Sequence, residues 1–253
     1  MTSPGLPAFP EAALTWLVGR PLAEARLLVL GRAGVPVIEQ LASTGASLVA
    51  CDASRGGLRA LLHRAPRALP TVARPERLPF APASFDAVLV HQSLQNLDAG
   101  SVLGELARVL RPGGHLAVSW LIRDDSVPWV RRLAALLQDV DPAAMTGNYG
   151  TDSVQALDRL AYFPTVERRN HRLWVPIARV DLMQMVAHRF PDLEAERLSQ
   201  LMGQVGALYE DAARPPEPLL LPYQVACWRA AVDHAGLPAD QLDAPDDGLA
   251  IRL

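Results

Sequence analysis

The sequence contains no lysine, and all 24 of its basic residues are arginine. Without a lysine amine the protein cannot form the Schiff bases of aldolases or of pyridoxal-phosphate enzymes. It also lacks the lysine that a phosphate-binding P-loop requires, which excludes a Walker-type nucleotidase. The absence of one residue type therefore removes several classes of enzyme.

Cysteine is scarce as well, since Cys51 and Cys227 are the only two. These cysteines and the six dispersed histidines have no metal-ligand spacing such as C-x-x-C, so we expect no bound metal. The first ten residues lack the charged and apolar regions of a signal peptide. We therefore expect a reduced, cytoplasmic protein.

Long apolar runs and a large excess of one charge are also missing. Residues 116–122 form one of the longest apolar stretches and are much shorter than the roughly 20 residues of a membrane helix. The net charge of −3 gives no general attraction for polyanions. We expect neither nucleic acid nor a membrane as a partner.

Short apolar runs alternate with amphipathic stretches through the first half of the chain, which is typical of β-α-β units around a parallel sheet. The apolar runs predict strands over residues 27–30 and 48–51 and a weak third strand over 69–73. The stretches between them, over 35–45 and 58–62, place apolar residues on one helix face.

The second half of the predicted core opens with an apolar strand over residues 85–93. A helix follows, with Asp98 as its candidate N-cap, and the Pro-Gly-Gly sequence at 112–114 ends it before a strand over 115–122. Beyond residue 123 the pattern changes to longer helices and two extended runs near 166–175 and 219–228.

The most specific signal is carried by residues 76–120, which read ERLPFAPASFDAVLVHQSLQNLDAGSVLGELARVLRPGGHLAVSW. This segment closely resembles the second half of S-adenosylmethionine-dependent methyltransferases related to the enzymes of menaquinone and ubiquinone biosynthesis. RDDSVPWVRRL at 123–133 and LPYQVACWRA at 221–230 are similar to segments of a bacterial subgroup of these enzymes. The resemblance therefore extends over most of the chain.

The resemblance implies a class I, α/β fold that is Rossmann-like and doubly wound. Its sheet would be mostly parallel and seven-stranded, with an antiparallel C-terminal hairpin and a helical lid. We expect a single domain over residues 1–253, with the Rossmann-like core at 20–123 and the lid, built from 124–210, and hairpin within 124–253.

The first turn after a strand normally carries an acidic residue and the pattern G-x-G-x-G in this family, because glycines let the backbone approach the cofactor. This sequence has Val29 at the acidic position and keeps Gly31, but Ala33 and Val35 replace the second and third glycines. Gly34 supplies a glycine at a different spacing. Gly31 and Gly34 are either cofactor-loop residues or turn glycines.

The resemblance places Asp52, at the end of the second strand, where a carboxylate binds the ribose hydroxyls of the cofactor. The alternative is a helix-capping role, for which Ser54 also competes. After the third strand, Arg74-Pro75-Glu76 stands where the family has an Asp-Ala pair that reads the adenine edge. Arg74 cannot accept a hydrogen bond and Pro75 cannot donate one, so both adenine contacts would be missing.

His91 ends the fourth strand, where cofactor and acceptor meet in the family, and is a candidate general base or else a structural histidine. Arg32 and Arg74 are either a solvated surface pair or a site for a phosphate-bearing ligand. The candidate cofactor-binding residues are Gly31, Arg32, Ala33, Gly34, Asp52, Ala53, Arg74, Pro75, Glu76, His91 and Gln92.

Two functions follow from this pattern. The departures from the family concentrate at cofactor-contacting turns, which favours a methyltransferase-fold protein impaired in S-adenosylmethionine use, serving as a partner subunit, a scaffold or a binder of another ligand. The alternative is an active enzyme that methylates a small acceptor. By the resemblance, Trp120, Trp129 and Trp174 lie toward the acceptor, either in the core or stacked on substrate. Residues 225–228 are a candidate contact with a protein partner or a second subunit.

Overall fold

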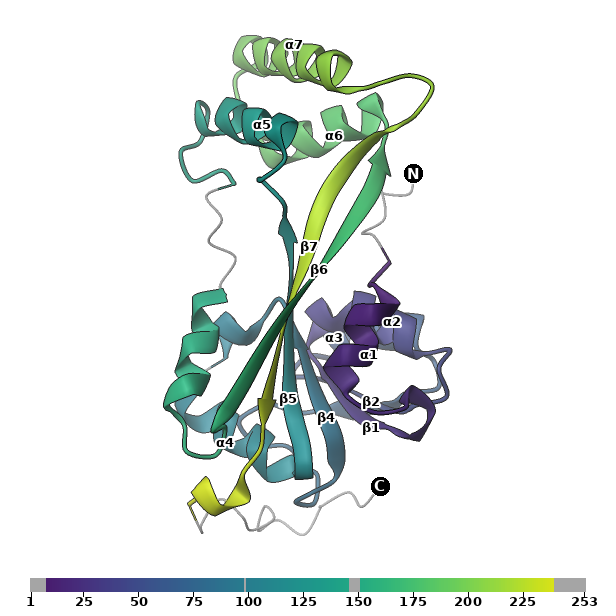
Figure 1. Ribbon diagram of the computed structural model, residues 1–253, viewed down its shortest axis with the longest axis vertical. Coiled ribbons are helices and arrows are strands. Elements are labelled where there is room, and N and C mark those ends of the chain that lie inside the picture. The colour runs from purple at the N-terminus through teal and green to yellow at the C-terminus, as the bar shows by residue number, and fades with distance from the viewer. Residues whose placement is uncertain (1–7, 98, 146–150, 239–253) are drawn as a thin grey trace. The chain divides into compact units, whose positions relative to one another are not determined.

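A computed structural model describes residues 8–97, 99–145 and 151–238 (Figure 1). Its central feature is a seven-stranded sheet with strand order β3-β2-β1-β4-β5-β7-β6. The first five strands are parallel and the last two antiparallel, which confirms the predicted fold class. The strands are β1 (Arg26–Leu30), β2 (Ser47–Asp52), β3 (Leu69–Val72), β4 (Phe85–His91), β5 (Leu110–Arg123), β6 (Thr165–Ile177) and β7 (Leu219–Ala231).

The helices follow the predicted alternation in the first half and cluster in the second. The α-helices are α1 (Glu11–Val18), α2 (Val35–Leu41), α3 (Arg55–Arg64), α4 (Ala99–Val109), α5 (Pro128–Gln138), α6 (Arg179–Arg189) and α7 (Ala195–Ala212). Short 3-10 helices are η1 (Leu22–Glu24), η2 (Arg32–Gly34), η3 (Leu94–Asn96), η4 (Thr151–Arg159) and η5 (His234–Gly236).

Two predicted boundaries are wrong. Helix α2 ends at Leu41, before Gly45, which adopts a φ of 83° in the turn that follows. Strand β5 begins at Leu110 and includes the Pro-Gly-Gly sequence that was expected to precede it. Gly113, at a φ of 78°, lets the strand continue through an irregular register opposite β4. The predicted N-cap Asp98 lies outside the described residues.

The chain forms two compact units, and strands β5, β6 and β7 contribute residues to both. Within the described ranges, the sheet unit comprises residues 8–121, 151–171 and 225–238, and the helical unit comprises 122–145 and 172–224. Helices α5, α6 and α7 belong to the helical unit.

The core of the sheet unit surrounds its parallel strands. Strand β4 is buried along its whole length, as expected for a strand covered on both faces. Helix α3 packs on β2 and on α2. Arg108 of α4 is only 2% exposed, and its guanidinium pairs with Glu105 and donates to the carbonyl oxygens of Leu78 and Phe80. This buried cation therefore fixes the turn that follows β3.

The helical unit has an apolar core of its own. The side chains that α5, α6 and α7 contribute to this core are Val130, Leu133, Leu137, Leu182, Val186, Leu201, Val205 and Leu208. Tyr209 adds a hydrogen bond from its hydroxyl to the carbonyl oxygen of Ile177.

Within the described ranges we find no helix with the length and apolar content to cross a membrane.

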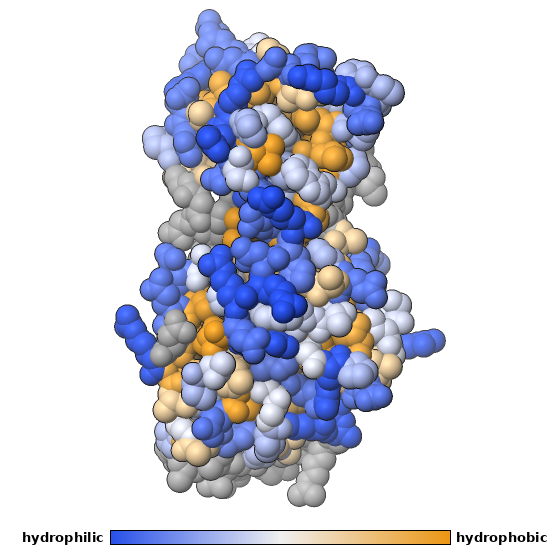
Figure 2. Space-filling view, in the orientation of Figure 1, coloured by the Kyte–Doolittle hydropathy of each residue, from blue (hydrophilic) through white to orange (hydrophobic). Residues whose placement is uncertain are grey.

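Strand β6 is the edge of the sheet and carries polar side chains. Glu167, Arg168, Arg169 and Asn170 are all exposed. Figure 2 shows hydrophilic surface along the path of β6 in this view. Charged side chains on an edge strand oppose the addition of a further strand from another chain.

Candidate cofactor site

The predicted site residues gather at the carboxyl ends of β1, β2 and β4. Leu30 of β1 pairs in register with Cys51 of β2 and with Val90 of β4, so Gly31, Asp52 and His91 follow at one edge of the sheet. The strand order reverses between β1 and β4, and ligands of open α/β sheets bind at such a point. The sequence therefore predicted the common edge correctly.

The turn after β1 is tight and needs both of its glycines. Gly31 has a φ of 77°, and its N–H donates to the carbonyl oxygen of Cys51. A Cβ on Gly34 would lie 2.6 Å from Cγ1 of Val29, so Gly34 allows the turn to pack on β1. Val35 has a helical φ of −50° and starts α2, so its backbone does not require glycine. Arg32 is exposed, and Ala33 is partly buried.

The carboxylate of Asp52 is held by protein donors. Its Oδ2 accepts the N–H of Arg32 at 2.8 Å, which joins the ends of β1 and β2. Its Oδ1 accepts both the N–H and the hydroxyl of Ser54, at 2.7 and 2.8 Å. Ser54 in turn caps α3 by accepting the N–H of Gly57. Of the two residues that the sequence offered as the cap of α3, Ser54 is the one that caps it, and Asp52 orients Ser54.

This geometry limits what Asp52 can bind. An ionised carboxylate offers about two acceptor directions on each oxygen. Both directions on Oδ1 are used by Ser54, and one on Oδ2 is used by Arg32. Chelation of two ribose hydroxyls needs a free direction on each oxygen, so it would require Ser54 to give up a hydrogen bond. Ala53, between the two residues, is exposed.

The turn after β3 bears Arg74 and Pro75, the two residues that depart from the family pattern there, followed by Glu76. The N–H of Ala73 donates to the carbonyl oxygen of Asp52, and the N–H of Arg77 donates to that of Arg74. Arg74 and Glu76 are exposed, and Pro75 is partly buried without an N–H to offer. Among the described residues, the guanidiniums of Arg32 and Arg74 have no hydrogen-bond or ion-pair partner. The edge beside Asp52 thus carries two guanidiniums that pair with no carboxylate among the described residues.

His91 is a core residue rather than an exposed base. Its side chain is 2% exposed, and its ring meets Phe9 edge-on with centroids 5.6 Å apart. Nδ1 lies 2.9 Å from the hydroxyl of Ser119, and Nε2 lies 3.2 Å from the side-chain amide of Gln92. Burial lowers the pKa of His91 to about 4, so the imidazole is neutral at physiological pH. These contacts favour the structural role over general-base catalysis.

Gln92 has an unusual backbone for a residue other than glycine. Its φ is 50°, and its N–H donates to the carbonyl oxygen of Ser119 at 2.8 Å. The side-chain amide of Gln95 donates to the carbonyl oxygen of Gln92. A left-handed residue at the end of β4 stores backbone strain at the edge where ligands of this fold bind.

Sequence reasoning missed Ser119 as the partner of His91. The available signal was a hydroxyl residue inside the apolar run of β5.

The three tryptophans expected toward the acceptor have different surroundings. Trp120 is buried and packs edge-on against Trp228. Trp174 is 48% exposed, and Trp129 is partly buried against the core of the helical unit.

Cys51 and Cys227 are buried, free thiols, and burial raises the pKa of each to about 12. The part of the chain that the structure describes contains no group of three or more metal-ligating side chains.

Comparisons with known proteins agree with this architecture. Residues 28–118 match the model of a methyltransferase domain family. An uncharacterized methyltransferase of Mycobacterium bovis is 30% identical over 240 residues, which cover 90% of this chain and 91% of the relative. A demethylmenaquinone methyltransferase of Corynebacterium urealyticum is 47% identical over 83 residues, covering 32% of this chain and 35% of that protein.

Among solved structures, a proposed type II methyltransferase from Anaeromyxobacter dehalogenans superimposes with a TM-score of 0.60. It is 22% identical, and the match covers 90% of this chain and 98% of that one. At this identity the likeness establishes the fold alone.

Proposed function

The chain belongs to the methyltransferase family, and we propose that within this family it binds S-adenosylmethionine weakly or not at all. It would then act as a partner subunit, a scaffold or a binder of another ligand. The observation that carries this proposal is the state of Asp52, whose Oδ1 already accepts two hydrogen bonds from Ser54 and whose Oδ2 accepts the N–H of Arg32.

The remaining contacts of the cofactor are affected in the same direction. Arg74 presents a cation where the family presents an acceptor for the adenine amino group, and Pro75 removes the neighbouring donor. Each lost neutral hydrogen bond costs about 0.5 to 1.5 kcal/mol, so these two losses correspond to roughly one to two decades in affinity. The residues present therefore do not fit the usual mode of S-adenosylmethionine binding.

The second candidate function is an active methyltransferase for a small acceptor. The family framework favours it, because the turn after β1 keeps Gly31 in the left-handed conformation and the sheet keeps its switch point beside it. Methyl transfer depends mainly on the alignment of sulfur, methyl and acceptor, so a buried, neutral His91 does not exclude it.

Isothermal titration calorimetry with S-adenosylmethionine and S-adenosylhomocysteine separates the two candidates. If use of the cofactor is impaired, we expect neither titration to show saturable binding with a dissociation constant in the low micromolar range. A low-micromolar dissociation constant that Asp52→Ala abolishes would overturn the proposal and assign the protein to the active enzymes.

We propose a cytoplasmic location for the protein, in keeping with its two unpaired cysteines. We also propose that any macromolecular partner is a protein or a second copy of this chain rather than nucleic acid or a membrane, given the net charge of −3. Fractionation of cells tests the location, and light scattering of the purified protein tests whether two copies of the chain associate.

A further inference from the structure

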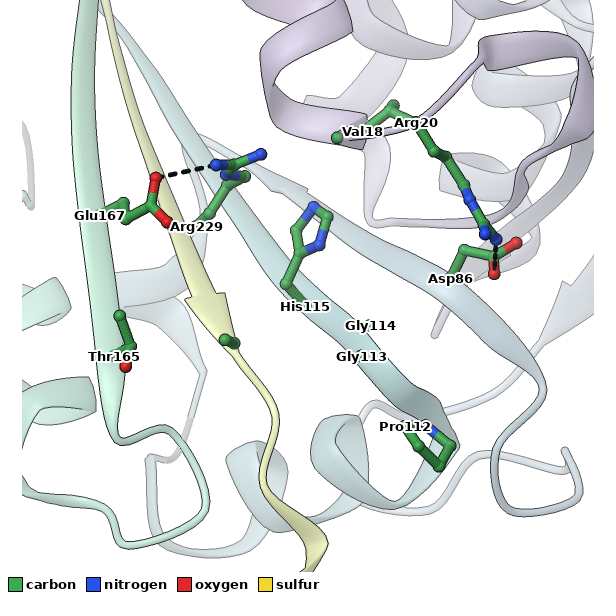
Figure 3. Close-up of a pocket in the computed structure, with 12 residues that line it drawn as sticks. Val18, Arg20, Asp86, Pro112, Gly113, Gly114, His115, Thr165, Glu167 and Arg229 are labelled. Atoms are coloured by element: carbon green, nitrogen blue, oxygen red, sulfur yellow. Dashed lines mark hydrogen bonds and ion pairs between the residues drawn. The ribbon is translucent and has the colours of Figure 1, made fainter.

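A polar cavity of about 320 Å³ lies at the amino ends of β4 and β5, away from the candidate cofactor site (Figure 3). Arg20, Asp86, His115, Glu167 and Arg229 line it together with glycines and small residues. In Figure 3 the His115 ring stands between Arg229 and Glu167 on one side and Arg20 and Asp86 on the other. A volume at the lower end of the range for ligand pockets suits a small molecule.

One carboxylate in the cavity wall forms ion pairs with two guanidiniums. The Asp86 side chain is 8% exposed and pairs with both Arg20 and Arg111, and it also accepts the N–H of Arg26. Burial alone would raise the pKa of Asp86, but this N–H and the guanidiniums hold it below the usual value. Asp86 is therefore ionised at neutral pH, and its one negative charge faces two guanidiniums, of which Arg20 lines the cavity and Arg111 does not.

The opposite wall is arranged similarly around Glu167, although of its two neighbouring arginines only Arg229 lines the cavity. Arg229 donates to Glu167 at 2.8 Å and to the carbonyl oxygen of Trp16 at 3.2 Å. Arg229 and Arg169 both lie over the Trp16 ring, at 4.5 and 5.4 Å from its centroid. Arg169 also acts electrostatically on Glu167, so this carboxylate faces two guanidiniums as well. Glu11, which lines an adjoining hollow with Arg169 and Arg229, does not cancel both excess charges.

His115 supplies a titratable group between the two walls. Its Nε2 contacts the carbonyl oxygen of Leu17, which can only accept, so Nε2 carries the proton. Within the described part of the chain Nδ1 has no hydrogen-bond partner. Burial and the charge of Arg229 lower the pKa of His115, and the hydrogen bond to Leu17 and the charges of Glu167 and Asp86 only partly oppose them. Nδ1 is therefore an unprotonated nitrogen in the wall of a cavity that more guanidiniums than carboxylates surround.

We propose that this cavity binds a compact oxyanion, either a phosphate or a small carboxylate, between Arg20 and Arg229 and beside His115. Guanidiniums recognise both groups through charge-assisted hydrogen bonds. The contacts to Trp16 and Leu17 also fasten the end of α1 to the sheet, but they use carbonyl oxygens and leave the excess positive charge in place. This site does not depend on how the protein uses S-adenosylmethionine.

The bound anion draws a proton onto His115. A negative charge beside Nδ1 stabilises the imidazolium, so anion binding and protonation reinforce each other. The charged groups that face the ring are Arg20 before β1, Asp86 of β4, Glu167 of β6 and Arg229 of β7. Protonation of His115 consequently tightens the binding of an anion whose own charge stays constant over the same pH range.

The test is an NMR titration of the histidine ring signals with sodium phosphate and, separately, sodium succinate, at an ionic strength kept constant with sodium chloride. His115→Gln identifies the His115 signal by its loss. We expect a saturable shift of this signal and a rise of its pKa by about one pH unit with at least one of the two anions. Saturation with only one of them identifies the ligand as a phosphate or a carboxylate, and no saturation with either overturns the proposal.

Substitutions in the cavity wall test whether the anion binds there. Arg20→Gln should weaken binding at least tenfold, whereas the matched control Arg64→Gln should leave it unchanged. The side chains of the two arginines are 43% and 49% exposed, and each pairs with one carboxylate, Asp86 of β4 for Arg20 and Glu39 of α2 for Arg64. Thr165→Asp adds a negative charge to the cavity wall and should abolish binding without removing any contact of α1. Wild-type affinity in Arg20→Gln or in Thr165→Asp would overturn the proposal.

Discussion

The carboxylate of Asp52 lies directly against Gly57, and a Cβ on Gly57 would stand 2.3 Å from both carboxylate oxygens. Such a distance is impossible, so any side chain at Gly57 must displace Asp52 from Arg32 and Ser54. The end of β2, the turn after β1 and the first turn of α3 are thereby coupled through one carboxylate.

The first prediction uses two adjacent glycines of α3. Gly57→Ala should lower the free energy of unfolding by about 1 to 3 kcal/mol, because it breaks the hydrogen bonds of Asp52. Gly56→Ala should raise it by up to about 1 kcal/mol, because its Cβ would meet nothing within 4 Å and alanine favours the helix. Urea denaturation measures both, and equal effects of the two substitutions would contradict the coupling.

The second prediction concerns acid sensitivity. Burial lowers the pKa of His91 from 6.5 to about 4. The unfolded chain binds this proton below about pH 6.5, whereas the folded protein binds it only near pH 4. The contribution of the neutral His91 to the free energy of unfolding is therefore fully present above pH 6.5. It is lost as the pH decreases toward 4, by about 3 kcal/mol in total.

Denaturation at pH 7 and at pH 5 tests this dependence. His91→Phe should reduce the loss of stability between the two pH values by about 2 kcal/mol. Ser119→Ala serves as the control, since it retains the buried imidazole and so retains the acid sensitivity. An unchanged pH dependence in His91→Phe would show that other groups control it.

The third prediction restores the family residues at the candidate cofactor site. Ala33→Gly and Val35→Gly combined with Arg74→Asp and Pro75→Ala should raise the affinity for S-adenosylmethionine by roughly 10-fold to 10²-fold, since a donor and an acceptor return to the adenine edge. Calorimetry on native and restored protein measures the change. No gain at all would locate the defect elsewhere, at the carboxylate of Asp52 that Ser54 and Arg32 occupy.

The fourth prediction concerns cooperativity. Strands β5, β6 and β7 contribute residues to both compact units, so neither unit is a continuous stretch of chain. We expect a single unfolding transition whose calorimetric and van't Hoff enthalpies agree. Two resolved transitions would mean that the units unfold separately and that the chain is not one domain.

The sequence alone determined the order of the strands along the chain and the edge of the sheet at which Gly31, Asp52 and His91 lie. Apolar runs and their spacing are local properties, and strands β6 and β7 were recognised in the same way as the parallel strands. Boundaries were less reliable where a backbone detail intervened, as at Gly113, whose left-handed conformation keeps the Pro-Gly-Gly sequence inside β5.

Only the tertiary structure decided what these residues contact. The role of Asp52 depends on the N–H of Arg32, 20 residues away, and that of His91 on Ser119, 28 residues away. The pairing of Arg20 with Asp86 spans 66 residues and puts an excess of positive charge into a cavity that no local pattern indicates. Burial and long-range partners set the charge and hydrogen bonding of a side chain, and both arise only when distant segments pack together.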